Sequence, residues 1–249
     1  MEFNYIWTGN WENAMRGLRH PMESYAKSDT KWYDDTETNE HLCGYNALEV
    51  DSDKLRFFAI GPNDFDLAQR MIKAGTPNDK FLRQIFVSID ITAPLYWWKE
   101  MDTYKVGTTA NSTSTMHKLA STPITIECFE MGDYNELTFE KSDQSEVTDT
   151  GKEIDFKAHW HLESERDRMI EWLEDLRQKY LETKDKKYWK ELIRWLPESW
   201  LQTRTWTADY AVLRNIYHWR KDHKLNEWRA FCDCISKLPY ANEFILFEN

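Results

Sequence analysis

Residues 103–118 (TYKVGTTANSTSTMHK) form a segment rich in small hydroxyl and amide side chains. Hydroxyls, backbone amides around Gly107 and flanking cations can together cradle a phosphate group. A solvated Ser/Thr loop has the same composition, so the segment indicates either an anion site or a plain surface loop. The candidate ligands in it are Lys105, Asn111, Ser112, Ser114, His117 and Lys118.

A second set of candidate residues lies within residues 191–223. Arg194 comes shortly before Leu196-Pro197, and Arg220 lies near the end of a predicted helix. On that helix an acid, apolar residues and a base recur every three to four positions, which places them on one face. These residues are Asp209, Leu213, Ile216, Tyr217 and Arg220. Such a face can line a cleft, but it can equally hold a surface ion pair or a snorkelling arginine.

Patterns typical of metals and common cofactors are weak in this chain. His159-Trp160-His161 with Glu163 would align three polar side chains on one face of a strand, although metal ligand sets are rarely this local. Cys232 and Cys234 lie in a predicted helix, where residues two apart point in different directions, so a structural role is favoured. We find no GxGxxG, P-loop or GxSxG pattern. We therefore predict no metal site.

The composition limits the classes of protein to which this chain can belong. The chain has 249 residues, a net charge of −11 and 41% hydrophobic residues, with 13 Trp, 12 Tyr and 12 Phe. The acidic surface argues against a general nucleic-acid-binding protein, although a local basic cluster can still bind a small anion. Four scattered cysteines, an N-terminus without an apolar segment and no long apolar run predict a cytoplasmic protein outside the membrane.

The candidate residues are positioned by a predicted mixed α+β fold, a single domain over residues 1–249 with a mixed β-sheet and a helical C-terminal half. We expect strands over residues 3–8, 42–50, 54–60 and 84–92. We expect helices over residues 11–18, from Pro62 to Gly75, and over 94–102, 163–183, 188–195, 207–223 and 225–238. Residues 24–40 and 103–118 are predicted to be loops, and residues 131–157 a flexible insertion.

Two stretches together resemble the flavin-dependent thymidylate synthases. Residues 76–114 (TPNDKFLRQIFVSIDITAPLYWWKEMDTYKVGTTANSTS) have the layout of that family's GHETPFEH-like segment, strand, Ala-Pro, aromatic helix and RHRxxSxNExSxR motif. Residues 192–223 (LIRWLPESWLQTRTWTADYAVLRNIYHWRKDH) resemble its RxxLP, WTxN and long helix ending in Arg with a nearby His. The two stretches cover about a third of the chain. A weaker likeness starts at Arg19-His20-Pro21.

The resemblance implies roles for individual residues. Asn111 and Ser114 match the Asn and the second Ser of the motif, which bind dUMP in the family. Arg194 matches the base-contacting Arg before Leu-Pro, which implies that it polarises the pyrimidine ring. Arg220 matches a dUMP-binding Arg on the long helix. Lys105 matches the last position of the Arg-His-Arg element that binds FAD.

Several matched positions carry a different residue type. Thr103-Tyr104-Lys105 stands in place of Arg-His-Arg, and Ser112 replaces the acidic residue of the motif. Asn78 replaces a His, Glu100 a Gln, Asp209 the Asn of WTxN and His218 a later Asn. By position, the resemblance implies substrate contacts for Ser112 and Glu100. It implies flavin contacts for Asn78, Arg83, Tyr104, Lys105, Asp209, His218 and His223.

The resemblance therefore implies a homotetramer that converts dUMP to dTMP with methylenetetrahydrofolate, reduced FAD and NADPH. Two alternatives stay open, a diverged dUMP or dCMP hydroxymethylase and a non-catalytic protein that binds a pyrimidine deoxynucleotide. The carboxylates at Glu100 and Asp209 also leave two interpretations open. They can favour cytosine by accepting from its exocyclic amine, or they can pair with cations such as Lys99, Arg194 or Arg220.

Overall fold

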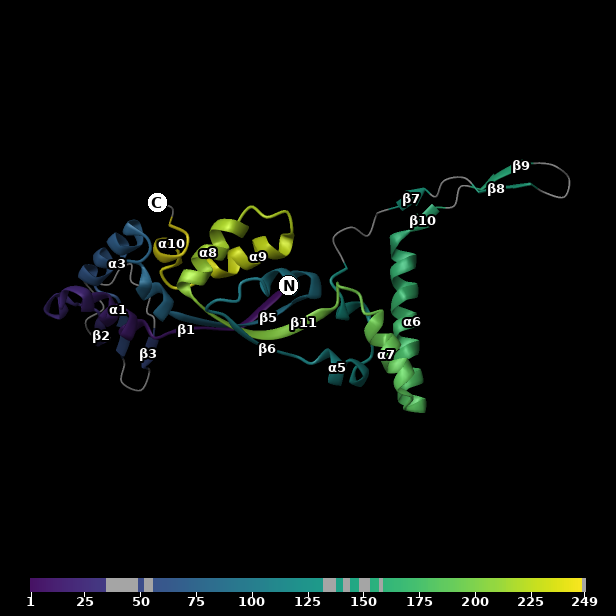
Figure 1. Cartoon of the computed structure of the whole chain (residues 1–249), viewed down its shortest axis with the longest axis horizontal. Helices are drawn as coiled ribbons and strands as arrows, with labels where there is room; N and C mark the ends of the chain where they lie inside the picture. The colour runs from purple at the N-terminus through teal and green to yellow at the C-terminus, as the bar shows by residue number, and fades with distance from the viewer. Residues whose placement is uncertain are drawn as a thin grey trace. The chain divides into compact units, whose positions relative to one another are not determined.

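The computed structural model describes residues 1–34, 49–51, 56–131, 138–140, 144–147, 153–156 and 159–247 (Figure 1). The chain divides into two compact units. The first comprises residues 1–92, 97–112 and 203–249, and the second comprises residues 93–96 and 113–202. The fold is α+β, as the sequence predicted.

A four-stranded sheet of order β1-β5-β11-β6 runs through the first unit. Strands β1 and β5 pair antiparallel, as do β11 and β6. Ser88 of β5 contacts Thr207 of β11, and Thr92 of β5 contacts Thr203. Strands β5 and β11 therefore run antiparallel as well. The strands are β1 (Glu2–Gly9), β5 (Phe86–Pro94), β6 (Thr109–Ser112) and β11 (Leu201–Asp209).

One face of this sheet is apolar and is covered by helices. On β5 the side chains of Val87, Ile89 and Ile91 are fully buried, which is the two-residue alternation of a half-buried strand. Helices α8 (Tyr210–Arg220) and α9 (Asn226–Ile235) lie over this face (Figure 1). Phe231 of α9 sits among aromatic rings there, and its neighbours are Phe3, Trp97, Trp206 and Trp228. Much of the aromatic excess therefore fills the core.

The opposite face of β5 and β11 is polar. Three cross-strand pairs join hydroxyl and carboxyl oxygens on it, Thr92 with Thr203 at 2.7 Å, Asp90 with Thr205 at 2.5 Å and Ser88 with Thr207 at 3.3 Å. The alternation of β11 is not evident in the sequence because Gln202 and Arg204 interrupt the apolar residues of its other face.

Smaller elements pack beside the sheet in the same unit. Strands β2 (Lys31–Asp34), β4 (Arg56–Ala59) and β3 (Glu49–Asp51) form a three-stranded antiparallel sheet of order β2-β4-β3. The helices are α1 (Trp11–Arg19), α3 (Pro62–Ala74), α4 (Leu95–Met101), whose first two residues belong to the second unit, and the short α10 (Ala241–Phe244). A 3₁₀ turn, η4, spans Lys80–Gln84.

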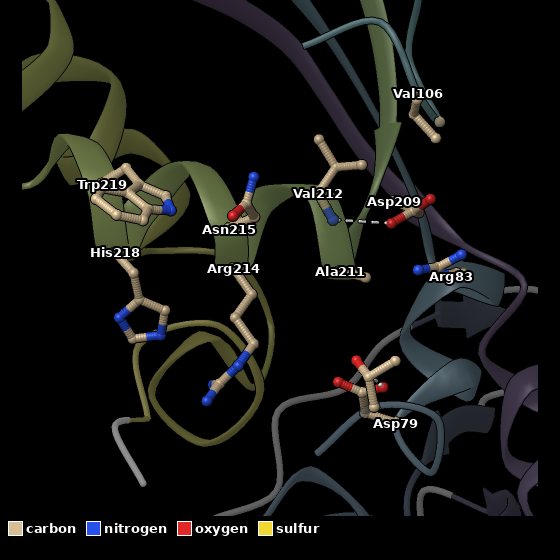
Figure 2. A pocket seen from close by; sticks show the side chains of 12 residues that line it. Asp79, Arg83, Val106, Asp209, Ala211, Val212, Arg214, Asn215, His218 and Trp219 are labelled. Carbon is tan, nitrogen blue, oxygen red and sulfur yellow. Dashed lines mark hydrogen bonds between the residues drawn. The ribbon is translucent and has the colours of Figure 1, made fainter.

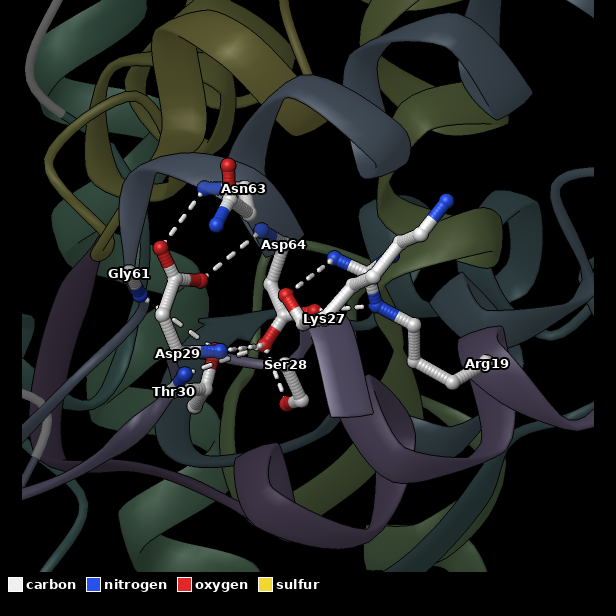
Figure 3. Close-up of polar contacts among 8 residues, drawn as sticks. All are labelled: Arg19, Lys27, Ser28, Asp29, Thr30, Gly61, Asn63 and Asp64. Carbon is white, nitrogen blue, oxygen red and sulfur yellow. Dashed lines mark hydrogen bonds and ion pairs between the residues drawn. The ribbon is translucent and has the colours of Figure 1, made fainter. Parts of the chain in front are cut away.

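A buried ion pair joins α1 to α3 (Figure 3). The Arg19 guanidinium donates to the Asp64 carboxylate at 2.6 Å, and both side chains are almost fully buried. Ser28 and the backbone of Thr30 also donate to Asp64, at 2.7 and 3.0 Å. Asp29 accepts hydrogen bonds from the backbone N–H groups of Asn63 and Asp64 in the first turn of α3. This network ties residues 28–30 to both helices.

The second unit is built around a helical hairpin. Helix α6 (Leu162–Thr183) packs against α7 (Lys186–Arg194), with Leu173 and Leu192 fully buried between them and Leu119, Ile124 and Phe129. Helix α5 (Thr115–Lys118) is linked to α7 by the Trp189 indole, which donates to the Met116 carbonyl at 3.2 Å. Four short strands are also described, β7 (Thr138–Glu140), β8 (Gln144–Val147), β9 (Glu153–Phe156) and β10 (His159–His161).

The structure corrects several expected elements. Residues 31–34 and 109–112 are strands inside predicted loops, and Pro94 ends β5 instead of starting a helix. Residues 207–209 end β11, so the helix begins at Tyr210, and the helical C-terminal half also contains this strand. The predicted strands at 42–50 and 54–60 lie partly outside the described residues, and most of the predicted insertion at 131–157 does too. The other predicted helices are present, with Cys232 and Cys234 in α9.

Candidate functional site

A pocket of about 720 Å³ extends along one face of α8 (Figure 2). It begins at Asp209, which precedes the helix, and ends at Trp219 near the helix C-terminus. Trp219 lies ten positions after Asp209, so the pocket runs roughly 15 Å along the helix at 1.5 Å per residue. Its volume lies within the range of about 300–1,000 Å³ that is typical of small-molecule sites.

The α8 residues that line the pocket are spaced so that they lie on one side of the helix. Ala211, Asn215 and His218 lie four and three residues apart, and Arg214 and Trp219 flank them. Leu213 and Ile216 face the core instead and are fully buried. Of the alternatives left open for the face from Asp209 to Arg220, a cleft-lining role applies to Asp209, whereas Arg220 forms an ion pair with Glu100.

Acidic and basic groups from distant segments meet in the pocket. Asp79 and Arg83 come from the turn after α3 and from η4, opposite α8 in Figure 2. Burial lowers the pKa of Arg214, and the charge of Asp79 partly opposes that effect. Burial raises the pKa of Asp209, while its hydrogen bonds to α8 and the charge of Arg83 act in the opposite direction. Each carboxylate thus lies near a guanidinium.

Asp209 has a structural partner at the start of the helix. Its carboxylate accepts the Val212 N–H at 2.9 Å and so caps α8. Gly107 packs against this carboxylate, with φ +78°, and a Cβ there would lie 2.9 Å from Oδ2 of Asp209. Only glycine adopts this backbone conformation readily, so Gly107 permits the loop before β6 to approach the cap.

Four predicted site residues form a second cluster, on the Arg220 side of α8. Arg220 pairs with Glu100 at 3.1 Å, and its Nε donates to the Tyr104 hydroxyl at 2.9 Å. The guanidinium lies over the Trp228 ring, 4.6 Å from its centroid. His223 Nε2 is 3.9 Å from the same Glu100 carboxylate. Glu100 therefore pairs with a cation, which is the second of the two interpretations given for this carboxylate.

The remaining predicted residues are spread over both units. Asn111 and Ser112 are exposed on β6, opposite Thr205 and Arg204, so their side chains point to opposite sides of the sheet. Asn78 lies in the turn after α3, where its N–H donates to Gly75, and Lys105 is exposed in the loop after α4.

The second unit holds Ser114 and Arg194, and it also holds His117 and Lys118, which lie in α5. Ser114 caps α5 by accepting the His117 N–H at 3.2 Å. Arg194 ends α7 and pairs with Glu191 at 2.5 Å.

The structure therefore brings Arg83, Asp209 and His218 together in the pocket, and Glu100, Tyr104, Arg220 and His223 in the second cluster. Sequence analysis missed the other polar and aromatic pocket residues, which are Thr76, Asp79, Arg214, Asn215 and Trp219. On α8, Arg214 and Asn215 lie four and three residues before His218, and Trp219 lies four residues after Asn215, so helical spacing could have identified these three. Among the described residues no cluster of His, Cys, Asp and Glu is suited to a metal, and the side chains of His159, His161 and Glu163 lie outside them. In the same part of the chain, no helix is long and apolar enough to cross a bilayer.

No family profile and no curated protein sequence matches this chain. Among solved structures, two crystal structures of the flavin-dependent thymidylate synthase ThyX from Helicobacter pylori with FAD and dUMP are similar to it, with TM-scores of 0.57 and 0.59. Each is 15% identical, and each alignment covers 98% of this chain and 97% of the other. This chain therefore has the fold of the flavin-dependent thymidylate synthases.

Proposed function

We propose that this chain is a flavin-dependent thymidylate synthase-like enzyme, which methylates dUMP to dTMP with methylenetetrahydrofolate, reduced FAD and NADPH. The observation that carries the proposal is the long, charged pocket along α8 in a fold whose Helicobacter pylori representative was crystallised with FAD and dUMP. The proposal includes a cytoplasmic homotetramer with shared sites.

The pocket residues fit a phosphorylated aromatic cofactor such as FAD. Arg83 and Arg214 offer guanidinium groups for phosphate oxygens, and Asn215 offers both a donor and an acceptor. The Trp219 side chain is 76% exposed at the end of the pocket, which leaves its ring available for stacking. Bound FAD, once reduced, supplies the reducing equivalents for the methyl transfer.

The nucleotide would be held by residues outside that pocket. Arg220 is preoriented by Tyr104 and Trp228, and it would bind phosphate oxygens through its remaining N–H groups. Arg194 would polarise the pyrimidine ring, and Ser114 with its neighbours would hold nucleotide oxygens. These roles are positional and electrostatic, so the reaction would require no cysteine nucleophile.

A second candidate is a nucleotide-binding protein that has lost flavin chemistry. It is favoured by Tyr104, which replaces the His of the family's Arg-His-Arg element and whose hydroxyl is already bonded to Arg220. Flavin retention separates the two candidates, because the first requires FAD and the second does not.

The test combines ligand binding with product analysis. The purified chain is expected to retain or take up FAD, seen as visible flavin absorption. It is also expected to form dTMP from dUMP, methylenetetrahydrofolate and NADPH, detected by mass spectrometry. Ligand at about 100 times Kd should add about 2.7 kcal/mol to stability in a thermal-shift assay. Nucleotide binding without flavin would favour the second candidate, and no binding of any pyrimidine monophosphate would refute both.

Substitution of two arginines tests where on the chain the nucleotide binds. Arg194→Ala and Arg220→Ala should each weaken dUMP binding by about 1.5–3 kcal/mol, the usual contribution of a charged hydrogen bond. Arg70→Ala is the matched control, because Arg70 pairs with Asp66 on the exposed side of α3, away from the proposed site. An equal loss in all three variants would show that the change is not specific to the proposed site.

A further inference from the structure

One oxygen of Glu100 is the meeting point of three donor groups. The Trp228 indole N–H lies 2.9 Å from Oε2, the Arg220 Nη1 atom 3.1 Å from it and His223 Nε2 3.9 Å from it. The Glu100 side chain is nevertheless 39% exposed. A carboxylate with this accessibility imposes its negative charge on any ligand that approaches Arg220.

Two aromatic side chains hold Arg220 in place in this cluster. Its guanidinium lies over the Trp228 ring, and its Nε is committed to the Tyr104 hydroxyl. Within the described part of the chain, only Nε and Nη1 have acceptors, and the side chain is 21% exposed. A rigid guanidinium with uncommitted N–H groups suits the oxygens of a phosphate monoester.

We propose that Glu100 is a built-in competitor for the nucleotide phosphate at Arg220, so that this carboxylate sets the affinity of the site. This inference rests on the proposed function only in taking the anion to be a nucleotide phosphate. A phosphate monoester carries a charge of about −1.5 to −2 at neutral pH, so it must share Arg220 with Glu100 or displace it. The carboxylate therefore weakens binding of phosphorylated ligands and leaves unphosphorylated ones unaffected.

Glu100→Gln separates the charge from the hydrogen bond. The amide oxygen can still accept from the Trp228 indole, whereas the negative charge beside Arg220 is lost. We expect dUMP affinity to rise about tenfold, the order expected for removing one like charge at this range near a protein surface. The affinity for deoxyuridine, which has no phosphate, should stay within about twofold.

The chain supplies a matched control on the same segment. Asp102 pairs with Arg204 at 2.8 Å, and that guanidinium lies over the Trp98 ring, 4.3 Å from its centroid. Asp102→Asn thus removes an equivalent acid from an equivalent Arg–Trp pair. It should leave dUMP affinity within about twofold of the wild type, since no phosphate is assigned to Arg204.

Calorimetry with dUMP, deoxyuridine and inorganic phosphate tests the proposal, with melting temperatures as the folding check. The gain in Glu100→Gln should disappear in Glu100→Gln/Arg220→Gln. If Glu100→Gln does not fold, Glu100→Asp, which withdraws the carboxylate by one methylene, should give a smaller gain of the same sign.

The outcomes separate this inference from the proposed function. If the wild type binds no pyrimidine monophosphate but Glu100→Gln binds inorganic phosphate more tightly, the proposed function fails and the competitor role stands. If Glu100→Gln binds neither dUMP nor phosphate more tightly, the competitor role is overturned. An equal gain for dUMP and deoxyuridine would also overturn it, because Glu100 would then act on the base.

Discussion

Asp64→Asn should be among the most destabilising single substitutions in the first unit. The Asp64 carboxylate is completely buried and accepts from Arg19, Ser28 and the backbone of Thr30, at 2.6 to 3.0 Å. An asparagine has the same shape, but its NH₂ group faces donors and the buried Arg19 charge loses its partner. Breaking a buried pair in this way costs about 3–5 kcal/mol.

The pH dependence gives a second, independent signature. Burial alone would raise the pKa of Asp64, but hydrogen bonds from Thr30, Ser28 and Arg19 outweigh it and lower the pKa below its ordinary 3.8. A lowered folded-state pKa stabilises the folded state above the unfolded value, and the effect is lost as pH falls through the folded value. The advantage of the wild type should therefore persist down to about pH 3.8 and shrink below it.

Urea unfolding followed by tryptophan fluorescence measures both effects. Asp66→Asn is the control, because Asp66 pairs with Arg70 on the exposed side of the same helix and should contribute at most about 0.5 kcal/mol. The double variant Arg19→Met/Asp64→Leu should recover much of the loss, since it removes both buried charges. A loss below about 1 kcal/mol for Asp64→Asn, or no recovery in the double variant, would refute this reasoning.

Three further substitutions have defined outcomes. Glu174→Gln should cost about 1–3 kcal/mol in urea unfolding, because hydrogen bonds, chiefly from Arg177, lower the pKa of Glu174 to about 2. Its wild-type advantage should disappear progressively between pH 4.5 and about 2. Asp209→Asn should raise the melting temperature at neutral pH and not at acid pH, since burial raises the pKa of Asp209 and so disfavours its charge, whereas the amide retains the cap without that charge. A lower melting temperature at pH 7 would contradict that explanation. Gly107→Ala should lose more than about 1 kcal/mol in urea unfolding, because φ is +78° and the new Cβ would lie 2.9 Å from Asp209 Oδ2. A neutral result would mean that the loop can move.

Sequence periodicity was sufficient for elements that carry their own signals. Helix α3 begins with Pro62, ends before Gly75 and buries Ala68 and Ile72, all of which the sequence displays. Strand β11 was missed because its covered face includes Gln202 and Arg204, while its open face carries threonines. Such a strand is specified by the neighbours with which it pairs, and those neighbours lie far away in the chain.

The candidate site shows the same division. Arg83, Asp209 and His218 were identified by resemblance, and the structure does place them in one pocket. The Glu100–Arg220 pair was anticipated only as one of several possible pairings, because 120 residues separate its members and spacing says nothing about such distances. A pattern of charged residues in the sequence can identify candidate site residues, but only the fold determines which of these residues contact one another.

The capping of α3 makes its first turn dependent on a remote segment. Gly61 has no side chain to cap the helix, and Asp29 accepts the N–H groups of Asn63 and Asp64 at 2.8 and 3.1 Å instead. An excised peptide of residues 61–75 should therefore fray at that end. In the intact chain, hydrogen exchange at the amides of Asn63 and Asp64 should report the detachment of residues 28–30, even while the middle of the helix stays protected.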